Sequence, residues 1–387
     1  MHRIDDEQRR IRLGRRHLLA PSVRAHSAVA VADAVVALHA TDAATVYLSS
    51  CARLSRPGVE VVERALYEDV ELVRLPSMRN TLFTVGRDIA PFVDAANARA
   101  VAAKERRTFL KHLREDGNGL DEYWLAEVEQ AALAALSARG HATGSELSAA
   151  VPALRTKITV FPGTRQETVQ TVASRVIRLL AADGRIRRDR PRGSWTSSQF
   201  RWTAAEPSPP VPTADAQAEL ARRWLRSYGP GTEADLKWWT GWGIRETRRA
   251  LIAARSEEVL LDSGAIGWVA PGDHAPEPPP EPWAALLPGL DPSAMGWADR
   301  GFHLSPAHRA ALFDRAGNIG PTVWWNGTIV GGWAQRPDGD VVWRLLADVG
   351  RDASHLIEAE AARLSSWVGE VRITPRFRTP LERELTS

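Results

Sequence analysis

The sequence repeats one order of elements, and this repetition restricts the possible folds more than any other feature. Residues 121–140 predict an amphipathic helix ended by Gly140, and a short helix follows with Thr143 or Ser145 as its N-cap. A longer helix is expected over 164–184. Two strand-like runs around a turn-rich segment then predict a hairpin over 185–203.

The same order recurs further along the chain. A helix over 215–229 precedes a second helix behind Thr232, a third helix covers 243–254, and a hairpin turns at Ser263-Gly264. Gly140, Thr143 and Glu146 have the same spacing as Gly229, Thr232 and Asp235. Helix, short helix, longer helix and hairpin is the order of a winged helix-turn-helix, so we expect tandem units of that kind.

The remaining segments extend this plan to the whole chain. Expected helices at 27–38, 42–54 and 58–68 and a hairpin at 71–85 indicate a looser first copy. Proline-rich linkers lie at 206–213 and 274–282, and Asn-Gly, Gly-Gly and Asp-Gly turns predict a small sheet after the second linker. The expected fold is α+β and mostly helical. We expect winged-helix units at 1–120, 121–205 and 206–273 and a β-rich part at 274–387.

Composition narrows the class of protein. No apolar run reaches the roughly 18 residues that a membrane span needs, and the charged N-terminus lacks a secretory pattern, so we expect a cytoplasmic protein without membrane contact. The lone Cys51 excludes an intramolecular disulfide and a zinc site of several cysteines, and the histidines lack paired ligand spacing. Nucleotide-binding and hydrolase motifs are absent from the sequence. We therefore expect neither a metal nor a cofactor.

The hairpin of the 121–205 unit carries a cluster of positive charge. Aromatic residues interleave with its arginines, a composition that suits a wing following a phosphate backbone and stacking on a base. The alternative is a solvated hairpin with its aromatic rings in the core. The candidate DNA-binding residues here are Arg185, Arg187, Arg188, Arg190, Arg192, Arg201 and Trp195.

A polar corner, His39-Ala40-Thr41-Asp42, separates two apolar runs that both predict helices. Asp42 is a candidate N-cap for the second helix, and His39 is placed at the C-terminal end of the first. Capping explains Asp42 well and explains His39 and Thr41 less well. Their spacing allows both side chains to point into one cleft, so we take all three as candidate catalytic residues.

Several motifs resemble the AlkZ/YcaQ family of winged-helix DNA glycosylases. They are "ALHATDAATVYLSSCARL", "ELVRLPSMRNTLFTV", the two repeats, "LLPGLDPSAMGWADR", "VWWNGTIVGGWA" and "ITPRF". The resemblance implies three winged helices around a channel for double-stranded DNA, excision of bulky N7-alkylguanines and unhooking of interstrand crosslinks, in DNA repair or self-resistance. Family members carry Gln–apolar–Gln or Gln–apolar–Asp where this chain has His39-Ala40-Thr41. Arg79 matches an arginine of the family, so we expect it to face the active-site cleft and to contact a DNA phosphate or support the polar corner; the alternative is a surface arginine on a strand.

The chemistry of such a reaction fits the altered motif. An N7-alkylguanine is already cationic and leaves without a general acid, so the protein must stabilise the sugar cation and place a water. Neutral histidine can hold that water and accept its proton, with Thr41 orienting it and Asp42 supporting the pair. Activity is then expected to fall as the pH drops through about 6.5.

A winged-helix DNA-binding protein without catalysis, either a transcriptional regulator or a lesion-binding protein, is the alternative function. Regulators with winged helices usually dimerise to read two half-sites. Here the repeats lie in one chain, which favours a monomeric enzyme. No lysine lies near the polar corner, so a Schiff-base lyase step is not expected.

Overall fold

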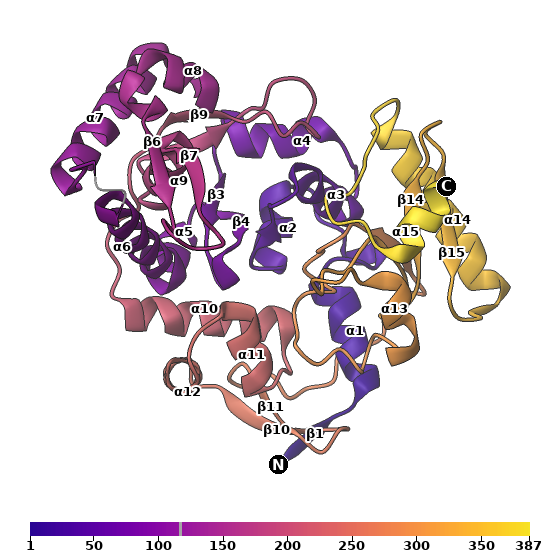
Figure 1. Cartoon of the computed structure of the whole chain (residues 1–387). Coiled ribbons are helices and arrows are strands. Elements are labelled where there is room, and N and C mark those ends of the chain that lie inside the picture. Colours follow the sequence, from indigo (N-terminus) through magenta and orange to yellow (C-terminus); the bar gives the residue numbers. More distant parts are fainter. Residues whose placement is uncertain (116–117) are drawn as a thin grey trace.

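In the computed structural model, which describes residues 1–115 and 118–387, the chain forms an α+β fold of helices and several small sheets. Figure 1 shows the elements of residues 28–86 near the centre, those of 122–204 on one side, those of 213–269 at the bottom beside the N-terminal strand, and the C-terminal sheet of residues 284–345 on the opposite side. None of the described helices is long and apolar enough to cross a membrane.

The first segment combines helices with a three-stranded sheet in the order β2-β4-β3. Its elements are β1 (His2–Ile4), α1 (Asp6–Arg16), α2 (Ala28–Ala34), β2 (Leu38–His39), α3 (Ala43–Arg53), α4 (Val59–Glu63), η2 (Arg64–Glu68), β3 (Leu72–Pro76), η3 (Met78–Asn80), β4 (Leu82–Gly86), α5 (Ala90–Val93), η4 (Asp94–Ala98) and α6 (Arg99–Glu115). The hairpin expected over 71–85 is present as β3 and β4.

The helix predicted over 27–38 is wrong in its last part. α2 ends at Ala34, and Val36 has a φ of 62°, a left-handed conformation that turns the chain out of the helix. Leu38 and His39 then pair with Thr84 and Phe83 of β4. His39 therefore lies on an edge strand and not at a helix C-terminus.

The second segment holds α7 (Glu122–Arg139), β5 (Ala142–Thr143), α8 (Gly144–Ala150), β6 (Lys157–Val160), β7 (Thr168–Thr171), α9 (Ala173–Ala182), β8 (Ile186–Asp189) and β9 (Arg201–Ala204). Thr143 begins α8 with a capping box, as one of the two N-cap choices predicted. The helix predicted from residue 164 is wrong at its start. The run Thr168-Val169-Gln170-Thr171 favours a strand and pairs with β6, and α9 begins only at Ala173.

The third segment follows its predicted order closely. It contains α10 (Thr213–Tyr228), α11 (Glu233–Thr240), α12 (Ile244–Ala253), β10 (Glu257–Leu261) and β11 (Ile266–Val269). Thr232 and Asp235 form a capping box, and Gly264, with a φ of 79°, lies in the turn of the hairpin. The sequence did not predict that β1 joins this hairpin, parallel to β10.

The predicted C-terminal sheet is present, in the order β12-β13-β14-β15. The C-terminal segment contains β12 (Ala284–Leu287), α13 (Arg309–Leu312), β13 (Thr322–Trp325), β14 (Thr328–Gln335), β15 (Val341–Leu345), α14 (Gly350–Val368) and α15 (Pro380–Thr386). The Asn326-Gly327 turn joins β13 to β14.

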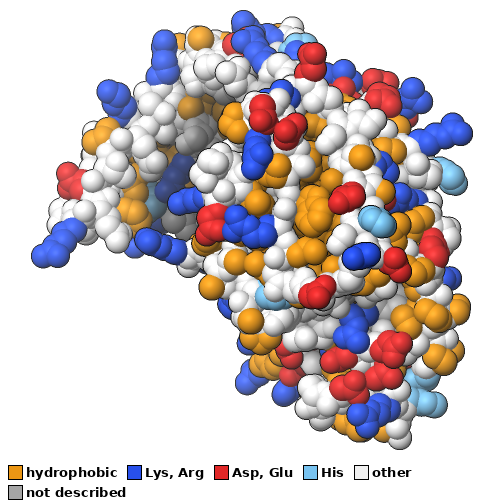
Figure 2. All heavy atoms as spheres, turned by 90° about the vertical axis from the view of Figure 1, so that its right-hand side faces the viewer, with side chains coloured by type: hydrophobic (Ala, Val, Ile, Leu, Met, Phe, Trp, Pro, Cys, Tyr) orange, Lys and Arg blue, Asp and Glu red, His pale blue; other side chains and the backbone are white. Residues whose placement is uncertain are grey.

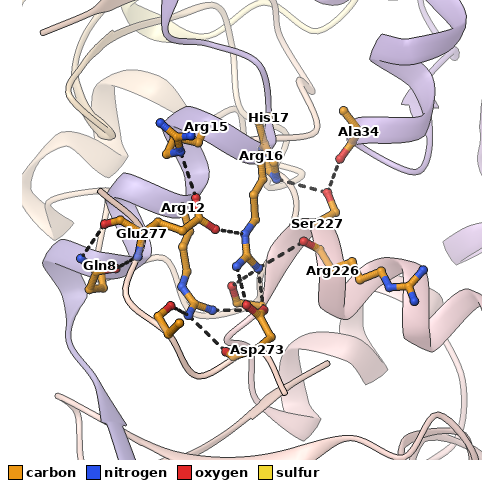
Figure 3. A network of polar contacts seen from close by, with 12 residues as sticks. Gln8, Arg12, Arg15, Arg16, His17, Ala34, Arg226, Ser227, Asp273 and Glu277 are labelled. Carbon is orange, nitrogen blue, oxygen red and sulfur yellow. Dashed lines mark hydrogen bonds and ion pairs between the residues drawn. The ribbon is translucent and has the colours of Figure 1, made fainter. Parts of the chain in front are cut away.

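Two polar networks fix the N-terminal helices against distant segments. Figure 3 shows the first, in which Arg16 of α1 forms ion pairs with Asp273 at 2.8 Å, just before the proline-rich linker at 274–282, and with Glu277 of that linker at 2.6 Å. In the second, the fully buried Arg53 of α3 pairs with the equally buried Asp291 at 2.7 Å. A buried charge is costly when its partner is removed or moved away, because no solvent is present to replace that partner. The second pair therefore anchors α3, the helix that follows the polar corner.

The hydrophobic cores do not correspond one to one to the predicted repeated units. One core joins residues of the first, third and C-terminal segments. Another joins residues of the first and C-terminal segments with Trp195 of the second segment. A separate core is built from residues between Phe109 and Ile186. The second segment therefore shares its main core with the end of α6, and its Trp195 packs into a core of the first and C-terminal segments.

Candidate functional site

The polar corner lies between an edge strand and a helix N-terminus. β2 ends at His39, the N–H of Ala40 donates to the carbonyl of Leu82 at 2.9 Å, and Asp42 caps α3. Three residues, Ala40 to Asp42, thus separate the end of β2 from the start of α3. This short connection fixes the directions of His39, Thr41 and Asp42 relative to one another.

His39 is a buried, neutral imidazole. Its side chain is packed edge-on to Phe83, with ring centroids 5.1 Å apart, and the residue is 5% exposed. Burial, together with the positive charge of Arg79, lowers the pKa of His39 to about 3. Its Nδ1 accepts the N–H of Thr41 over a long 3.5 Å, which favours the tautomer with the proton on Nε2. The expected loss of activity near pH 6.5 does not fit this environment.

Asp42 has the capping role that its position indicated. One carboxylate oxygen accepts the N–H of Ala44 at 3.1 Å, and the other accepts the N–H of Arg376 at 3.0 Å. Arg376 returns a guanidinium hydrogen bond to the carbonyl of Thr41 at 3.3 Å. The C-terminal segment thus closes over the corner, while the hydroxyl of Thr41 has no partner among residues 1–115 and 118–387.

Arg79 lies near the corner and packs on the third segment. Its guanidinium carbon is 4.1 Å from the ring centroid of Trp238 on α11, and its charge acts on His39. The described residues provide it with no carboxylate partner, and burial, with the charge of Arg300, lowers its pKa to about 10. Arg79 is therefore a half-buried cation whose charge the described part of the protein does not neutralise.

The arginines of the 185–202 hairpin fall into two groups. Ion pairs hold Arg185 to Glu129, Arg190 to both Glu63 and Glu68, and Arg192 to Glu146. Arg201 donates to the carbonyl of Arg190 and lies 3.1 Å from Nε2 of His141. These four side chains connect the hairpin to the rest of the protein.

Arg187 and Arg188 are different, because neither has a carboxylate partner within the described chain. Arg188 stacks on Phe200 at 3.8 Å, and its Nε is buried without a hydrogen bond. Burial and the charges of Arg74 and Arg376 lower its pKa to about 10. These two side chains are available to an anion from outside.

Trp195 does not have the role proposed for it from the sequence. It is 5% exposed and packs against Tyr47 and Trp367, with ring centroids 5.1 and 5.8 Å away. A ring enclosed in this way cannot stack on a nucleobase. The alternative of an aromatic residue in the core is correct for this tryptophan.

A cavity of about 610 Å³ lies between the first and second segments. The β3–β4 hairpin forms one wall, and α9, β8 and the start of α8 form the other. Figure 2 shows that the molecule is hollowed on one side, with Lys and Arg side chains along the hollow. The polar and charged residues that line the cavity are Arg74, Asn80, Thr81, Glu105, Ser145, Ser148, Thr171, Ser174, Arg178, Arg187 and Arg188.

Sequence reasoning missed two residues of this site, Arg376 and Arg74. Arg376 lies in the "ITPRF" motif that carried part of the family resemblance, so the motif itself was a usable signal. Arg74 donates to the hydroxyl of Tyr67 at 2.9 Å and lies on the strand opposite the basic hairpin. No local pattern distinguishes it from an ordinary strand arginine. Across the described ranges, no group of three or more His, Cys, Asp or Glu side chains has the arrangement of a metal site.

Comparisons with known proteins point to one family. The family model described as "DNA glycosylase AlkZ-like" matches residues 32–367. Among solved structures, the Streptomyces sahachiroi DNA glycosylase AlkZ is similar over 97% of this chain and 99% of its own, with a TM-score of 0.71 and 21% sequence identity. No curated protein matches the chain.

Proposed function

The chain belongs to the AlkZ-like DNA glycosylase family, and from this premise we propose that it hydrolyses the N-glycosidic bond of bulky N7-alkylguanines in double-stranded DNA. One observation carries the proposal. The neutral His39 and the hydroxyl of Thr41 lie near Arg79, whose charge acts on His39 and which no carboxylate of the described residues pairs with. Unpaired arginines suit a polyanion, and the polar corner suits a water molecule.

We interpret the repeated elements as three winged-helix units, at 1–120, 121–205 and 206–273, with the β-rich part at 274–387. The capping boxes at Thr143 and Thr232 and the two hairpins that follow support this interpretation. α9 holds the place of a recognition helix, yet Ser174, Ile177 and Arg178 of that helix line the cavity between the first and second segments. We therefore expect DNA to contact the walls of this cavity and not to receive α9 in its major groove.

The proposed reaction replaces a C–N bond by a C–O bond. The bond between C1′ and N9 breaks, its electron pair neutralises the cationic base, and a water oxygen attacks the sugar cation at C1′. The attacking water then loses a proton to the surrounding solvent, which leaves an abasic site and a free alkylguanine. Because the base leaves without protonation, the residues of the protein act mainly on the water and on the sugar cation.

His39 is assigned the positioning of this water. A group whose pKa is near 3 is a weak base at neutral pH. The proposed role of His39 is therefore to hold the water, and it does not include full removal of the proton of that water. The Nε2–H of a neutral imidazole can hold the water oxygen, and the hydroxyl of Thr41 can orient it. Asp42 keeps both in place through its cap on α3 and its contact with Arg376.

DNA backbone contacts are assigned to Arg79, Arg187 and Arg188, which lack carboxylate partners in the part of the chain that the structure covers. Arg185, Arg190, Arg192 and Arg201 hold the hairpin in position through the contacts described above. The single chain supplies all of these residues, so the proposed enzyme acts as a monomer. Unhooking of interstrand crosslinks would use the same cleavage on each tethered guanine.

The test is incubation with a duplex that carries one bulky N7-alkylguanine, followed by alkali and a sequencing gel. The proposal expects a cut at the modified guanine with the wild type and a much weaker one with His39→Ala. A matched duplex joined by an interstrand crosslink tests unhooking. Tight binding of both duplexes without base release would instead favour the DNA-binding protein without catalysis.

A further inference from the structure

Trp238 carries two arginines on its indole ring. The guanidinium carbon of Arg79 is 4.1 Å and that of Arg300 is 4.9 Å from the ring centroid. The three residues come from the β3–β4 turn, from α11 and from the irregular segment after β12. Three distant parts of the chain thus bring two positive charges to one aromatic surface.

Asp235 and Asp299 offset the charge of Arg300 only in part, and no described carboxylate pairs with Arg79. No ion pair joins Arg79 or Arg300 to any carboxylate of the described residues, and burial lowers the pKa of Arg300 to about 10, with the charge of Arg309 adding to the effect. Asp235 is near, but its two oxygens are taken by N–H and O–H donors of Thr232 and by the N–H groups of Ala298 and Asp299. A half-buried pair of like charges is costly unless an anion joins it.

The backbone around Arg79 is held in an unfavourable conformation. Arg79 and Asn80 have φ values of 52° and 59°, in the left-handed region that residues with a side chain rarely adopt. A Cβ on Gly241, at the end of α11, would lie 3.3 Å from the backbone nitrogen of Arg79, so the turn is pressed against the third segment. Strain of this kind persists where the surroundings fix a side chain for a purpose other than stability.

The arrangement is partly exposed and acts electrostatically on the polar corner. Arg79, Trp238 and Arg300 are all half-buried and not enclosed, and the charge of Arg79 acts on His39. Two guanidinium groups with fixed planes match the oxygens of a phosphodiester. We propose that Arg79 and Arg300, held by Trp238, bind the backbone of one DNA strand at a phosphate beside the nucleotide that His39 serves. This inference rests on the proposed function. It adds Arg300, supported by Trp238, to the arginines assigned above to the DNA backbone.

A scan with neutral linkages tests the assignment without using catalysis. One methylphosphonate is placed at a time along each strand of a duplex that contains a stable abasic-site analogue, and the dissociation constant is measured for each duplex. For the wild type we expect affinity to fall by about 10-fold or more at one linkage within a nucleotide or two of the analogue. Arg79→Gln and Arg300→Gln should bind the all-phosphate duplex more weakly. They should show no further decrease at that linkage or at its neighbour.

Arg315→Gln is the matched control, because Arg315 is exposed and has no ion pair in the described chain. It should reproduce the wild-type profile. If both single variants remain as sensitive as the wild type at every linkage, the phosphate assignment is wrong. Should a variant fold poorly, the wild-type scan alone still decides, since a profile without a sensitive linkage near the analogue contradicts the inference.

The two levels of the proposal fail differently. A wild type that neither binds the duplex nor releases an alkylated base contradicts the proposed function. A wild type that does both, with Arg79→Gln and Arg300→Gln equal to the Arg315→Gln control, contradicts only the phosphate site at Trp238.

Discussion

The carboxylate of Asp42 accepts the backbone N–H of Arg376 at 3.0 Å, across 334 positions of sequence. Its other oxygen caps α3 through Ala44, and Arg376 donates back to the carbonyl of Thr41. One carboxylate therefore joins the start of a helix to the C-terminal segment that closes over it. The geometry of the polar corner depends on both contacts.

Asp42→Ala should lower the free energy of unfolding by about 1–2 kcal/mol, the usual effect of losing an N-cap. It should also slow base release per folded molecule, because the segment around Arg376 loses its attachment. Asp121→Ala is the control, since Asp121 caps α7 through the N–H of Trp124 at 2.9 Å and lies outside the corner. Thermal unfolding and single-turnover rates separate the two effects. Equal rates for the two variants would show that Asp42 acts only as a cap.

The two groups of hairpin arginines should differ in DNA binding. Arg187→Gln with Arg188→Gln is expected to weaken duplex binding and to reduce the salt slope by about 0.9 for every phosphate that is no longer neutralised. Arg190→Gln with Arg192→Gln removes the same formal charge from side chains already paired with glutamates. Binding titrations across a series of salt concentrations compare the pairs. Identical slopes would refute the division into free and structural arginines.

Protonation of His39 should not change the rate of base release between about pH 5.5 and 8. Its pKa is lowered to about 3, so the imidazole stays neutral as the pH falls through the usual histidine range near 6.5. Single-turnover rates on an N7-alkylguanine duplex across this range test the point. A decline centred near pH 6.5 that disappears in His39→Gln would mean that His39 titrates as an ordinary base in the complex.

Trp195 is expected to matter for stability and not for recognition. Trp195→Ala should lower the free energy of unfolding by about 3–5 kcal/mol, because it empties a site enclosed by Tyr47 and Trp367. The affinity of the folded fraction for DNA should be unchanged. Chemical unfolding and DNA binding are measured on the same preparation of the variant. A weaker affinity for DNA with an unchanged free energy of unfolding would favour the hypothesis that Trp195 stacks on a base.

Local signals in the sequence were enough for much of the fold. The capping boxes at Thr143 and Thr232 and the turn at Gly264 depend on neighbouring residues only, and all three are present. Pairing between distant segments was not predictable in this way. β1 joins β10 across more than 250 positions, and β2 exists because a left-handed Val36 turns the chain toward β4.

The candidate site shows the same limit. The pattern around His39 drew attention to the corner, but it placed His39 on a helix because apolar periodicity alone does not reveal a backbone turn. Charge clustering identified the basic hairpin without separating its free arginines from its paired ones. Glu63, Glu68 and Glu146, which form the pairs, come from other elements, so the local sequence of the hairpin cannot identify them.

The central claim is that His39 places the attacking water, and one comparison of rates tests it most directly. Single-turnover base release from a duplex with one bulky N7-alkylguanine is measured for the wild type, His39→Ala, His39→Gln and Thr41→Val, each normalised to its folded fraction. His39→Ala should be slower by on the order of 10²-fold, because an unplaced water reacts poorly. His39→Gln, which can hold a water but is a poor base, should stay within about 10-fold of the wild type, and Thr41→Val should lose less than His39→Ala. Equal rates for wild type and His39→Ala would contradict the claim.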